Sequence, residues 1–134
     1  MAEKKMYVVA ADDDPMVRRL LEYCCNQAGY SNGVSVVMGS FCNGQKAWNY
    51  IKLLATQPHL LITDLNMPEM RGDDLIRLSR KQFPDLPVIM ISAVEPGLTE
   101  SAKDLADLLK VEFVEKPLKA FSFIEAVAKY APKE

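Results

Sequence analysis

The sequence predicts an α/β protein built on a doubly wound, five-stranded parallel sheet with the strand order 2-1-3-4-5. Short apolar runs alternate with segments whose apolar residues recur at helical spacing, a pattern typical of successive β-α units with helices on both faces of a sheet. Two runs, residues 60–63 and 88–92, are apolar almost throughout, as expected of parallel strands covered on both faces. The 134 residues fit one domain, and the predicted order places a ligand crevice at the carboxyl ends of strands 1 and 3.

The strands are expected where the apolar runs are short and rich in β-branched residues. They are "YVVAA" (7–11), "VSVVM" (34–38), "LLIT" (60–63), "VIMIS" (88–92) and "VEFVE" (111–115). Residues that break regular structure stand between the elements, among them Gly29, "SNG" (31–33) and "EPG" (95–97). The positions of these breakers agree with an alternation of strands and helices.

Five segments carry apolar residues along one helical face. These faces are Val17, Leu20, Leu21, Cys24 and Ala28; Ala47, Trp48, Ile51, Leu54 and Ala55; Leu75, Ile76, Leu78 and Phe83; Ala102, Leu105, Ala106 and Leu109; and Phe121, Ile124, Val127 and Ala128. The first helix also has a start signal, because Asp14 stands directly before Pro15 and proline is favoured at the first position of a helix. We therefore expect Asp14 to cap this helix rather than to bind a metal.

Composition excludes several classes of function. Apolar residues make up 49% of the chain, charged residues 25%, and the formal charge is -2, so no basic surplus favours nucleic acid or a membrane surface. No apolar stretch approaches the roughly 20 residues of a membrane span, and the N-terminus lacks a signal-peptide pattern, so we expect a cytoplasmic protein. Cys24, Cys25, Cys42 and the single His59 form no zinc pattern, which predicts reduced thiols and a surface or strand-edge histidine.

Polar side chains stand at the ends of strands that the predicted order makes neighbours. They are Asp12 and Asp13 after strand 1, Asp64 after strand 3, Ser92 at the end of strand 4 and Lys116 after strand 5. Since neighbouring strands lie about 4.8 Å apart and end at one edge of the sheet, we expect a single site. Carboxylates so close repel one another unless a cation intervenes, and oxygen ligands suit a hard ion such as Mg2+. A carboxylate beside a metal and an ammonium group is also what phosphoryl transfer to aspartate requires.

Four motifs follow one another along the chain: "DDDP" (12–15), "LLITDLNMPEMRG" (60–72), "PVIMISA" (87–93) and "FVEKP" (113–117). Together they closely resemble the receiver domain of two-component response regulators, including the chemotaxis regulators. The resemblance covers residues 4–131 and implies one receiver domain of the flavodoxin-like fold, with no output domain in this chain. It implies a phosphoprotein that works in a phosphorelay and in signal transduction.

The resemblance also implies how the metal and the phosphoryl group are held. Asp64 would accept a phosphoryl group from the phosphohistidine of a sensor histidine kinase or a histidine phosphotransfer protein. Mg2+, which Mn2+ can replace, would be bound by Asp13 directly, by Asp12 mainly through water, by Asp64 and by the backbone carbonyl of Asn66. Asn66 and Val94, each two positions past a key residue, would flank the approach of water and tune the lifetime of the phosphoryl group.

Three further residues would respond to phosphorylation. Lys116, whose bond to Pro117 is expected to be cis, would pair with the acceptor carboxylate and then with the phosphoryl group. Ser92 would hydrogen-bond a phosphoryl oxygen, and Phe113 would turn into the space that Ser92 vacates. These changes would reshape the face made by helix 4, strand 5 and helix 5, residues 98–130, where a downstream protein would bind.

Two alternative functions use the same residues differently. A Mg2+-dependent phosphohydrolase of the haloacid dehalogenase type would also use Asp64 as its nucleophile, but it needs a second acid where this chain has Asn66. A flavodoxin-like cofactor binder would need a phosphate-cradling loop after strand 1, where the aspartates repel phosphate. We therefore expect a signalling module that catalyses its own phosphorylation and dephosphorylation, not an enzyme. We expect Arg71, beside the site, to be a solvated loop residue.

Overall fold

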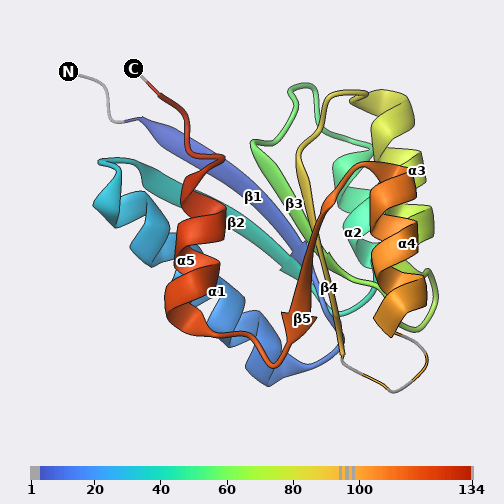
Figure 1. The fold of residues 1–134 in the computed structure, drawn as a ribbon. Helices are drawn as coiled ribbons and strands as arrows, with labels where there is room; N and C mark the ends of the chain where they lie inside the picture. The colour runs from blue at the N-terminus through green and yellow to red at the C-terminus, as the bar shows by residue number, and fades with distance from the viewer. Residues whose placement is uncertain (1–3, 94, 96, 98, 134) are drawn as a thin grey trace.

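Five parallel strands form the central sheet, in the order β2-β1-β3-β4-β5 (Figure 1). The structure is a computed structural model that describes residues 4–93, 95, 97 and 99–133. The strands are β1 (Lys5–Ala11), β2 (Ser35–Phe41), β3 (Leu60–Asp64), β4 (Val88–Ala93) and β5 (Glu112–Lys116). The predicted fold class and strand order are confirmed.

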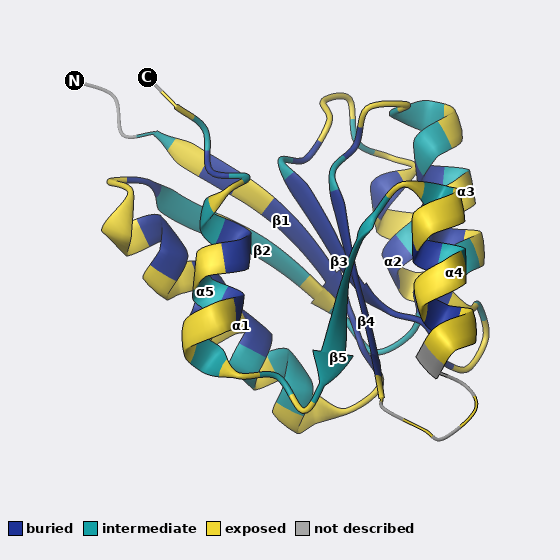
Figure 2. Ribbon diagram, viewed as in Figure 1, coloured by how far each residue is buried: buried dark blue, intermediate teal, exposed yellow. Residues whose placement is uncertain are grey.

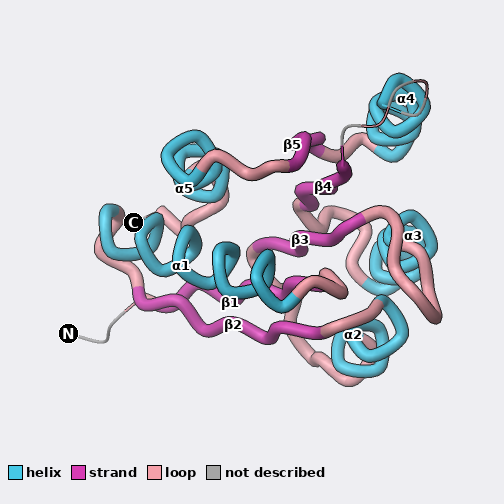
Figure 3. The backbone as a smooth tube through the Cα atoms, turned by 90° about the horizontal axis from the view of Figure 1, so that it is seen from below, coloured by secondary structure: helices cyan, strands magenta, loops and turns pink. Residues whose placement is uncertain are grey.

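Five helices cover the sheet in two layers. They are α1 (Pro15–Ser31), α2 (Gly44–Ile51), α3 (Gly72–Gln82), α4 (Thr99–Leu109) and α5 (Ala120–Ala128). Helices α1 and α5 lie on one face of the sheet, and α2, α3 and α4 lie on the other (Figure 3). Each face has its own apolar core, with Leu21 and Phe123 buried on the first and Ile51 and Leu75 on the second. In the described part of the chain, no helix is long and apolar enough to cross a membrane.

The central strands β3 and β4 are buried along almost their whole length (Figure 2). Strands that are covered by helices on both faces need apolar side chains on both faces, and β3 and β4 are apolar almost throughout. Leu61 lies opposite Val88 and Asp64 lies opposite Ile91 in the ladder. The two strands therefore reach the same edge of the sheet, where the predicted site residues gather.

Helix α1 begins as predicted. The side chain of Asp14 accepts the N–H of Met16 at 2.8 Å, and Pro15 is the first helical residue. A side-chain acceptor at this position satisfies an otherwise free N–H group and contributes about 1 kcal/mol to stability. The contact supports capping, rather than metal binding, as the work of Asp14.

Helix α2 is shorter than its apolar pattern predicts. It ends at Ile51, so Leu54 and Ala55 follow it in irregular structure. The side chain of Gln82 in α3 donates hydrogen bonds to the main-chain oxygens of Ile51 and Leu54, at 3.2 and 3.0 Å. This tertiary contact holds the end of the helix, and the local pattern of apolar residues does not reveal it.

Helix α5 turns a different aromatic residue toward the core. Phe121 was expected on the buried face, but it is 79% exposed, whereas Phe123 is 1% exposed. The prediction for Phe121 is therefore wrong. Both residues suit an apolar helix, and the packing of α5 against α1 decides which one is buried.

Gly29 lies inside α1 instead of breaking it. A Cβ atom at this position would collide with the side chain of Val36 and the main-chain oxygen of Val34. The glycine is therefore needed because the segment that begins β2 packs closely against the last turn of the helix.

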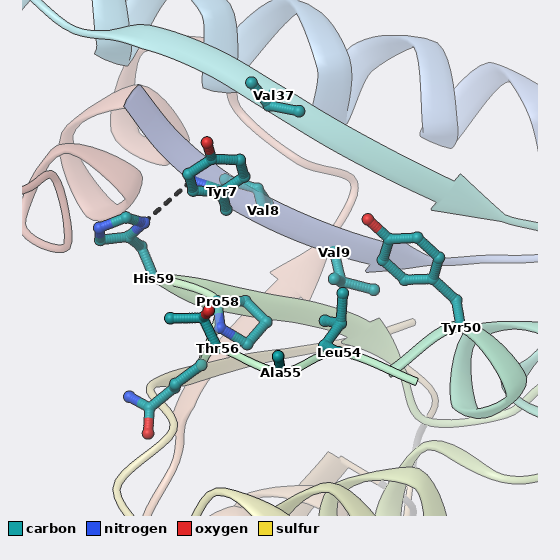
Figure 4. Close-up of a pocket in the computed structure, with 11 residues that line it drawn as sticks. Tyr7, Val8, Val9, Val37, Tyr50, Leu54, Ala55, Thr56, Pro58 and His59 are labelled. Atoms are coloured by element: carbon teal, nitrogen blue, oxygen red, sulfur yellow. Dashed lines mark hydrogen bonds between the residues drawn. The ribbon is translucent and has the colours of Figure 1, made fainter. Parts of the chain in front are cut away.

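A hollow of about 470 Å³ lies on the α2 side of β1, and its walls include Tyr7, Tyr50, Pro58 and His59 (Figure 4). The main-chain N–H of Tyr7 donates to Nδ1 of His59 at 2.9 Å, and the main-chain N–H of His59 donates to the carbonyl oxygen of Tyr7 at 2.8 Å. The imidazole thus takes the place of a carbonyl group just before β3. The expected strand-edge histidine is confirmed, and its Nδ1 must be deprotonated to accept this bond.

His59 should give the fold a pH-dependent contribution. Burial lowers the pKa of His59 from its usual value of 6.5, so the folded chain favours the neutral ring. Stability from this contact is therefore present above the unfolded-state pKa and is lost as pH falls below it. We expect His59→Asn, which keeps an acceptor but does not titrate, to lose less stability than the unchanged chain between about pH 7.5 and about pH 5.

Urea unfolding at a series of pH values measures this difference. No other imidazole interferes, because the chain has one histidine. Parallel stability profiles for the two proteins would show that the neutral ring does not hold β1 and β3 together.

Candidate functional site

The carboxyl ends of β1, β3 and β5 bring two carboxylates and one ammonium group together. Asp12 follows β1, Asp64 ends β3 and Lys116 ends β5. Asp12 is fully buried and Asp64 is 5% exposed, so both charges lie largely out of water. The N–H of Asp12 donates to the carbonyl oxygen of Phe41 at 3.1 Å, and Lys116 lies opposite Ala93 in the ladder. The sheet itself therefore positions the three groups.

Lys116 is shared between the two buried carboxylates. Its Nζ lies 2.8 Å from Oδ2 of Asp12 and 3.3 Å from Oδ2 of Asp64. Burial lowers the pKa of Lys116, but its contacts with the two carboxylates raise it more, so the pKa lies above its usual value. The sequence predicted the contact with Asp64 but not the contact with Asp12. The Lys116–Pro117 bond is cis, as the resemblance implied.

The surroundings of Asp64 raise the pKa of its carboxyl group. Burial raises its pKa, and the negative charge of Asp12 adds to this effect, whereas Lys116 lowers the pKa and Asp13 raises it slightly. The result is a pKa of about 6, compared with 3.8 for a free aspartate. A further cation among these carboxylates would favour the ionised form of Asp64.

Asp12, Asp13 and Asp64 form an acid cluster that fits a hard divalent cation. One oxygen from each carboxylate lies within 4.8 Å of the others. Oδ1 of Asp12 accepts the N–H of Asp14 at 2.9 Å, which orients this carboxylate. Its Oδ2 lies within ion-pair distance of Lys116 but makes no well-aligned hydrogen bond. Oxygen-only donors are the ligands that Mg2+ and Mn2+ prefer. The acidic pocket is therefore compatible with the predicted metal.

The remaining predicted residues lie around this cluster at different depths. Ser92 is 4% exposed and lines a hollow of about 320 Å³ together with Asn66 and Arg71. Phe113 is half-buried in β5 and packs against the core under α2, α3 and α4. Val94 lies outside the residues that the structure describes.

The loop between β3 and α3 leaves Arg71 exposed, as predicted, but polar contacts hold its side chain. Its Nη1 donates to Oδ1 of Asn66 at 3.0 Å, and its Nε pairs with Oδ1 of Asp73 at 3.1 Å. The side chain of Arg71 is 52% exposed, yet these two contacts connect it to both sides of the loop. Arg71 is thus an exposed loop residue, as predicted, and two polar contacts also hold its guanidinium group.

Two supporting residues were missed by sequence reasoning. Arg18 in α1 donates from Nη1 to the carbonyl oxygen of Asp12 at 2.7 Å, a contact without a local sequence signal because arginine is common on helix surfaces. The N–H of Gly72 donates to the carbonyl oxygen of Leu65 at 2.9 Å, and a Cβ atom at Gly72 would collide with the carbonyl group of Asp64. The sequence did offer a signal here, because a glycine at the end of the loop motif indicates a close approach between the start of α3 and the end of β3.

The raised pKa of Asp64 predicts a gain of stability on neutralisation. The folded-state pKa of about 6 exceeds the usual 3.8, so stability from the protonated form is complete below the lower value and is lost as pH rises through the higher one. Without divalent cations, we expect Asp64→Asn to raise the free energy of unfolding at neutral pH by about 1 to 3 kcal/mol. This gain should shrink as the pH falls from about 7 to about 4.

Chemical unfolding in the presence of a chelator measures the effect. Asp85→Asn is the matched control, because Asp85 is exposed on the loop after α3 and its loss should change stability by less than about 0.5 kcal/mol. Equal stability of the Asp64→Asn variant and the unchanged chain at neutral pH would contradict the inference that the folded state disfavours the ionised form of Asp64.

Comparison with known proteins assigns the family. The family model described as the response regulator receiver domain matches residues 8–128. Chemotaxis protein CheY1 of Helicobacter pylori is 33% identical over 97 residues, which cover 71% of this chain and 73% of that protein. A protein-glutamate methylesterase/protein-glutamine glutaminase of Syntrophotalea carbinolica is 32% identical over 117 residues, 85% of this chain and 30% of that protein. The chain spans about a third of the length of such methylesterases.

Solved structures share the fold. The BeF3-activated DrrB receiver domain, 16% identical, aligns with a TM-score of 0.76 over 94% of this chain and 97% of that chain. Chemotaxis response regulator CheY4 of Vibrio cholerae, 19% identical, aligns with a TM-score of 0.73 over 95% of this chain and 99% of that chain. With the family match across most of the sequence and a sheet of the same order, the chain belongs to the response regulator receiver domain family of two-component signalling.

Proposed function

We propose that this chain accepts a phosphoryl group on Asp64 from the phosphohistidine of a sensor histidine kinase or a histidine phosphotransfer protein. The main support is the buried arrangement in which Lys116 lies 2.8 Å from Asp12 and 3.3 Å from Asp64. A nucleophilic carboxylate, neighbouring carboxylates for a metal and a fixed ammonium group are the components that phosphoryl transfer to aspartate uses. We place the reaction in the cytoplasm, as expected from the sequence.

In the proposed transfer, a carboxylate oxygen of Asp64 attacks phosphorus in line with the bond that breaks. The new bond is the P–O bond of the aspartyl phosphate. The P–N bond of the donor breaks, and the donor imidazole leaves with the electron pair and becomes protonated. A pKa of about 6 leaves most of Asp64 ionised at neutral pH, so the nucleophile is available.

Lys116 and Ser92 are placed to distinguish the phosphorylated form from the free acid. Phosphorylation adds a charge of about -1.5 to -2. The Lys116 ammonium already lies within ion-pair distance of Asp64, and Ser92 is buried at the same edge of the sheet. Both groups would bind phosphoryl oxygens better than a bare carboxylate, and such a difference in contacts is what shifts a two-state equilibrium.

Asp13, Asp12, Asp64 and the backbone carbonyl of Asn66 would hold Mg2+, with Asp12 acting mainly through water. When bound, the metal would neutralise charge on the carboxylates and on the phosphoryl oxygens. Asp12 has a second task in the proposed site, because the same carboxylate pairs with Lys116.

The face formed by α4, β5 and α5 is the proposed surface for a downstream partner. Each of the two helices carries a large apolar side chain that is open to solvent: Leu108 of α4 is 75% exposed and Phe121 of α5 is 79% exposed. Lys103 of α4 pairs with Glu115 of β5 at 3.3 Å. Since Phe113 is half-buried in the same strand, its inward movement on phosphorylation would alter this face.

The phosphohydrolase alternative gains no support from the site. A hydrolase of that type needs an acid two residues after the nucleophile, and this position is Asn66. An asparagine carboxamide cannot act as a general acid, and its oxygen here accepts a hydrogen bond from Arg71. We retain the signalling function.

Incubation with acetyl phosphate tests the acceptor assignment. With Mg2+ present, we expect the unchanged chain to gain one phosphoryl group, seen by intact mass spectrometry, and Asp64→Ala to gain none. Asp85→Ala, which removes an exposed aspartate, should still be labelled. Omission of the metal should abolish labelling, because the carboxylates and the donor phosphate then repel one another.

Stable labelling of Asp64→Ala, or labelling that is indifferent to Mg2+, would contradict the assignment. Continuous turnover of phosphate esters by the unchanged chain would support the hydrolase instead.

The two exposed aspartates of the first loop should have separable effects. We expect Asp13→Ala to weaken Mg2+ binding at least about tenfold, because it removes one of three clustered carboxylates. Asp14→Ala should leave Mg2+ affinity nearly unchanged and lower the free energy of unfolding by about 1 kcal/mol, since it removes the cap of α1. Titration calorimetry and chemical unfolding measure the two effects, and equal Mg2+ affinities in both variants would refute this division.

A further inference from the structure

A chain of polar contacts runs from the loop beside Asp64 into the first turn of α3. Arg71 donates from Nη1 to Oδ1 of Asn66 at 3.0 Å and from Nε to Oδ1 of Asp73 at 3.1 Å. The other oxygen of Asp73 accepts from Nη1 of Arg77 at 3.1 Å. Four side chains on one loop and one helix are thereby connected.

The guanidinium group of Arg71 is anchored on its helix side. Burial raises the pKa of Asp73, but the guanidinium groups of Arg77 and Arg71 lower it more, so the pKa lies below its usual value and the carboxylate is ionised at neutral pH. The backbone of Arg71 is fixed as well, because its carbonyl oxygen accepts the N–H of Leu75 at 3.0 Å at the start of α3. Arg71 is therefore held by the helix and in turn holds the loop.

The held group, Asn66, stands on the open side of the proposed phosphorylation site. It follows Asp64 by two residues, its side chain is exposed, and it lines the same hollow as Arg71 and the buried Ser92. Water that reaches a phosphoryl group from this side passes the Asn66 carboxamide. The orientation of this carboxamide therefore matters for hydrolysis.

We propose that Arg71 is a positioning residue that holds the Asn66 carboxamide by its oxygen and so prolongs the lifetime of the phosphoryl group on Asp64. This inference rests on the proposed function. In hydrolysis, the oxygen of water bonds to phosphorus, the P–O bond to Asp64 breaks, and the Asp64 carboxylate, inorganic phosphate and a released proton result. A hydrogen-bond acceptor beside phosphorus helps to orient the attacking water.

The carboxamide oxygen is the acceptor that Asn66 has to offer. While that oxygen accepts from the cationic guanidinium group, it is both fixed in direction and a poorer acceptor for a second donor. Removal of Arg71 leaves the carboxamide free to turn and to accept from water. Hydrolysis should then become faster, although Arg71 does not itself touch the reacting atoms.

A double-mutant cycle on the phosphorylated protein tests the proposal. The unchanged chain, Arg71→Ala, Asn66→Ala and the double variant are phosphorylated with acetyl phosphate and Mg2+, freed of reagent, and followed by intact mass spectrometry. We expect Arg71→Ala to shorten the half-life about 3- to 10-fold, the range expected when a hydrogen bond of ordinary strength is lost. In the Asn66→Ala background the same substitution should change the half-life by less than about twofold.

Arg77→Ala is the matched control, because Arg77 pairs with Asp73 but makes no contact with Asn66 in the described structure. Its half-life should stay within about twofold of the unchanged chain. The dependence of phosphorylation rate on acetyl phosphate concentration should be the same in Arg71→Ala and in the unchanged chain. A general loosening of the fold would alter both phosphorylation and hydrolysis, so this comparison separates positioning from stability.

An unchanged half-life in Arg71→Ala, or the same change in both Asn66 backgrounds, would overturn the proposal while leaving phosphorylation of Asp64 intact. Failure of the unchanged chain to acquire a phosphoryl group at Asp64 would instead overturn the proposed function, and this role with it. The two failures are therefore distinguishable in one series of spectra.

Discussion

The ammonium group of Lys116 between the carboxylates of Asp12 and Asp64 is the contact on which the site depends. Each carboxylate is almost fully buried, and two buried negative charges so close together are unstable without a positive charge between them. Strand β4 separates β3 from β5, and β3 lies between β1 and β4, so Lys116 reaches Asp64 from two strands away and Asp12 from three. The site therefore exists only when β1, β3, β4 and β5 have assembled in this order.

The same ion pairs leave the site incompletely neutralised. Lys116 lowers the pKa of Asp64, yet burial and the charge of Asp12 still raise it to about 6. The remaining repulsion among these carboxylates would be reduced by a bound divalent cation, or by a modification whose added groups make their own contacts. The buried strands β3 and β4 (Figure 2) hold this arrangement. The close approach of Gly72 to the end of β3 places the start of α3 beside it.

Local sequence was sufficient for the parts of the structure that depend on short-range chemistry. The apolar runs of β3 and β4 marked strands covered on both faces, and Asp14 before Pro15 marked the start of α1, because a cap needs only residues two or three positions apart. Helix ends and helix rotation were harder to predict. The end of α2 depends on Gln82 from another helix, and the choice of Phe123 over Phe121 for the core depends on where α1 lies.

The sequence by itself determined the fold class, the strand order and the residues that meet at the carboxyl edge of the sheet. It could do so because strand periodicity and the rules of parallel crossovers leave few arrangements open. Only the tertiary structure decided that Lys116 pairs with Asp12 as well as Asp64, that Arg18 supports Asp12, and that Arg71 holds Asn66. These contacts depend on directions and distances between side chains on different elements, which folding establishes and which residue spacing does not encode.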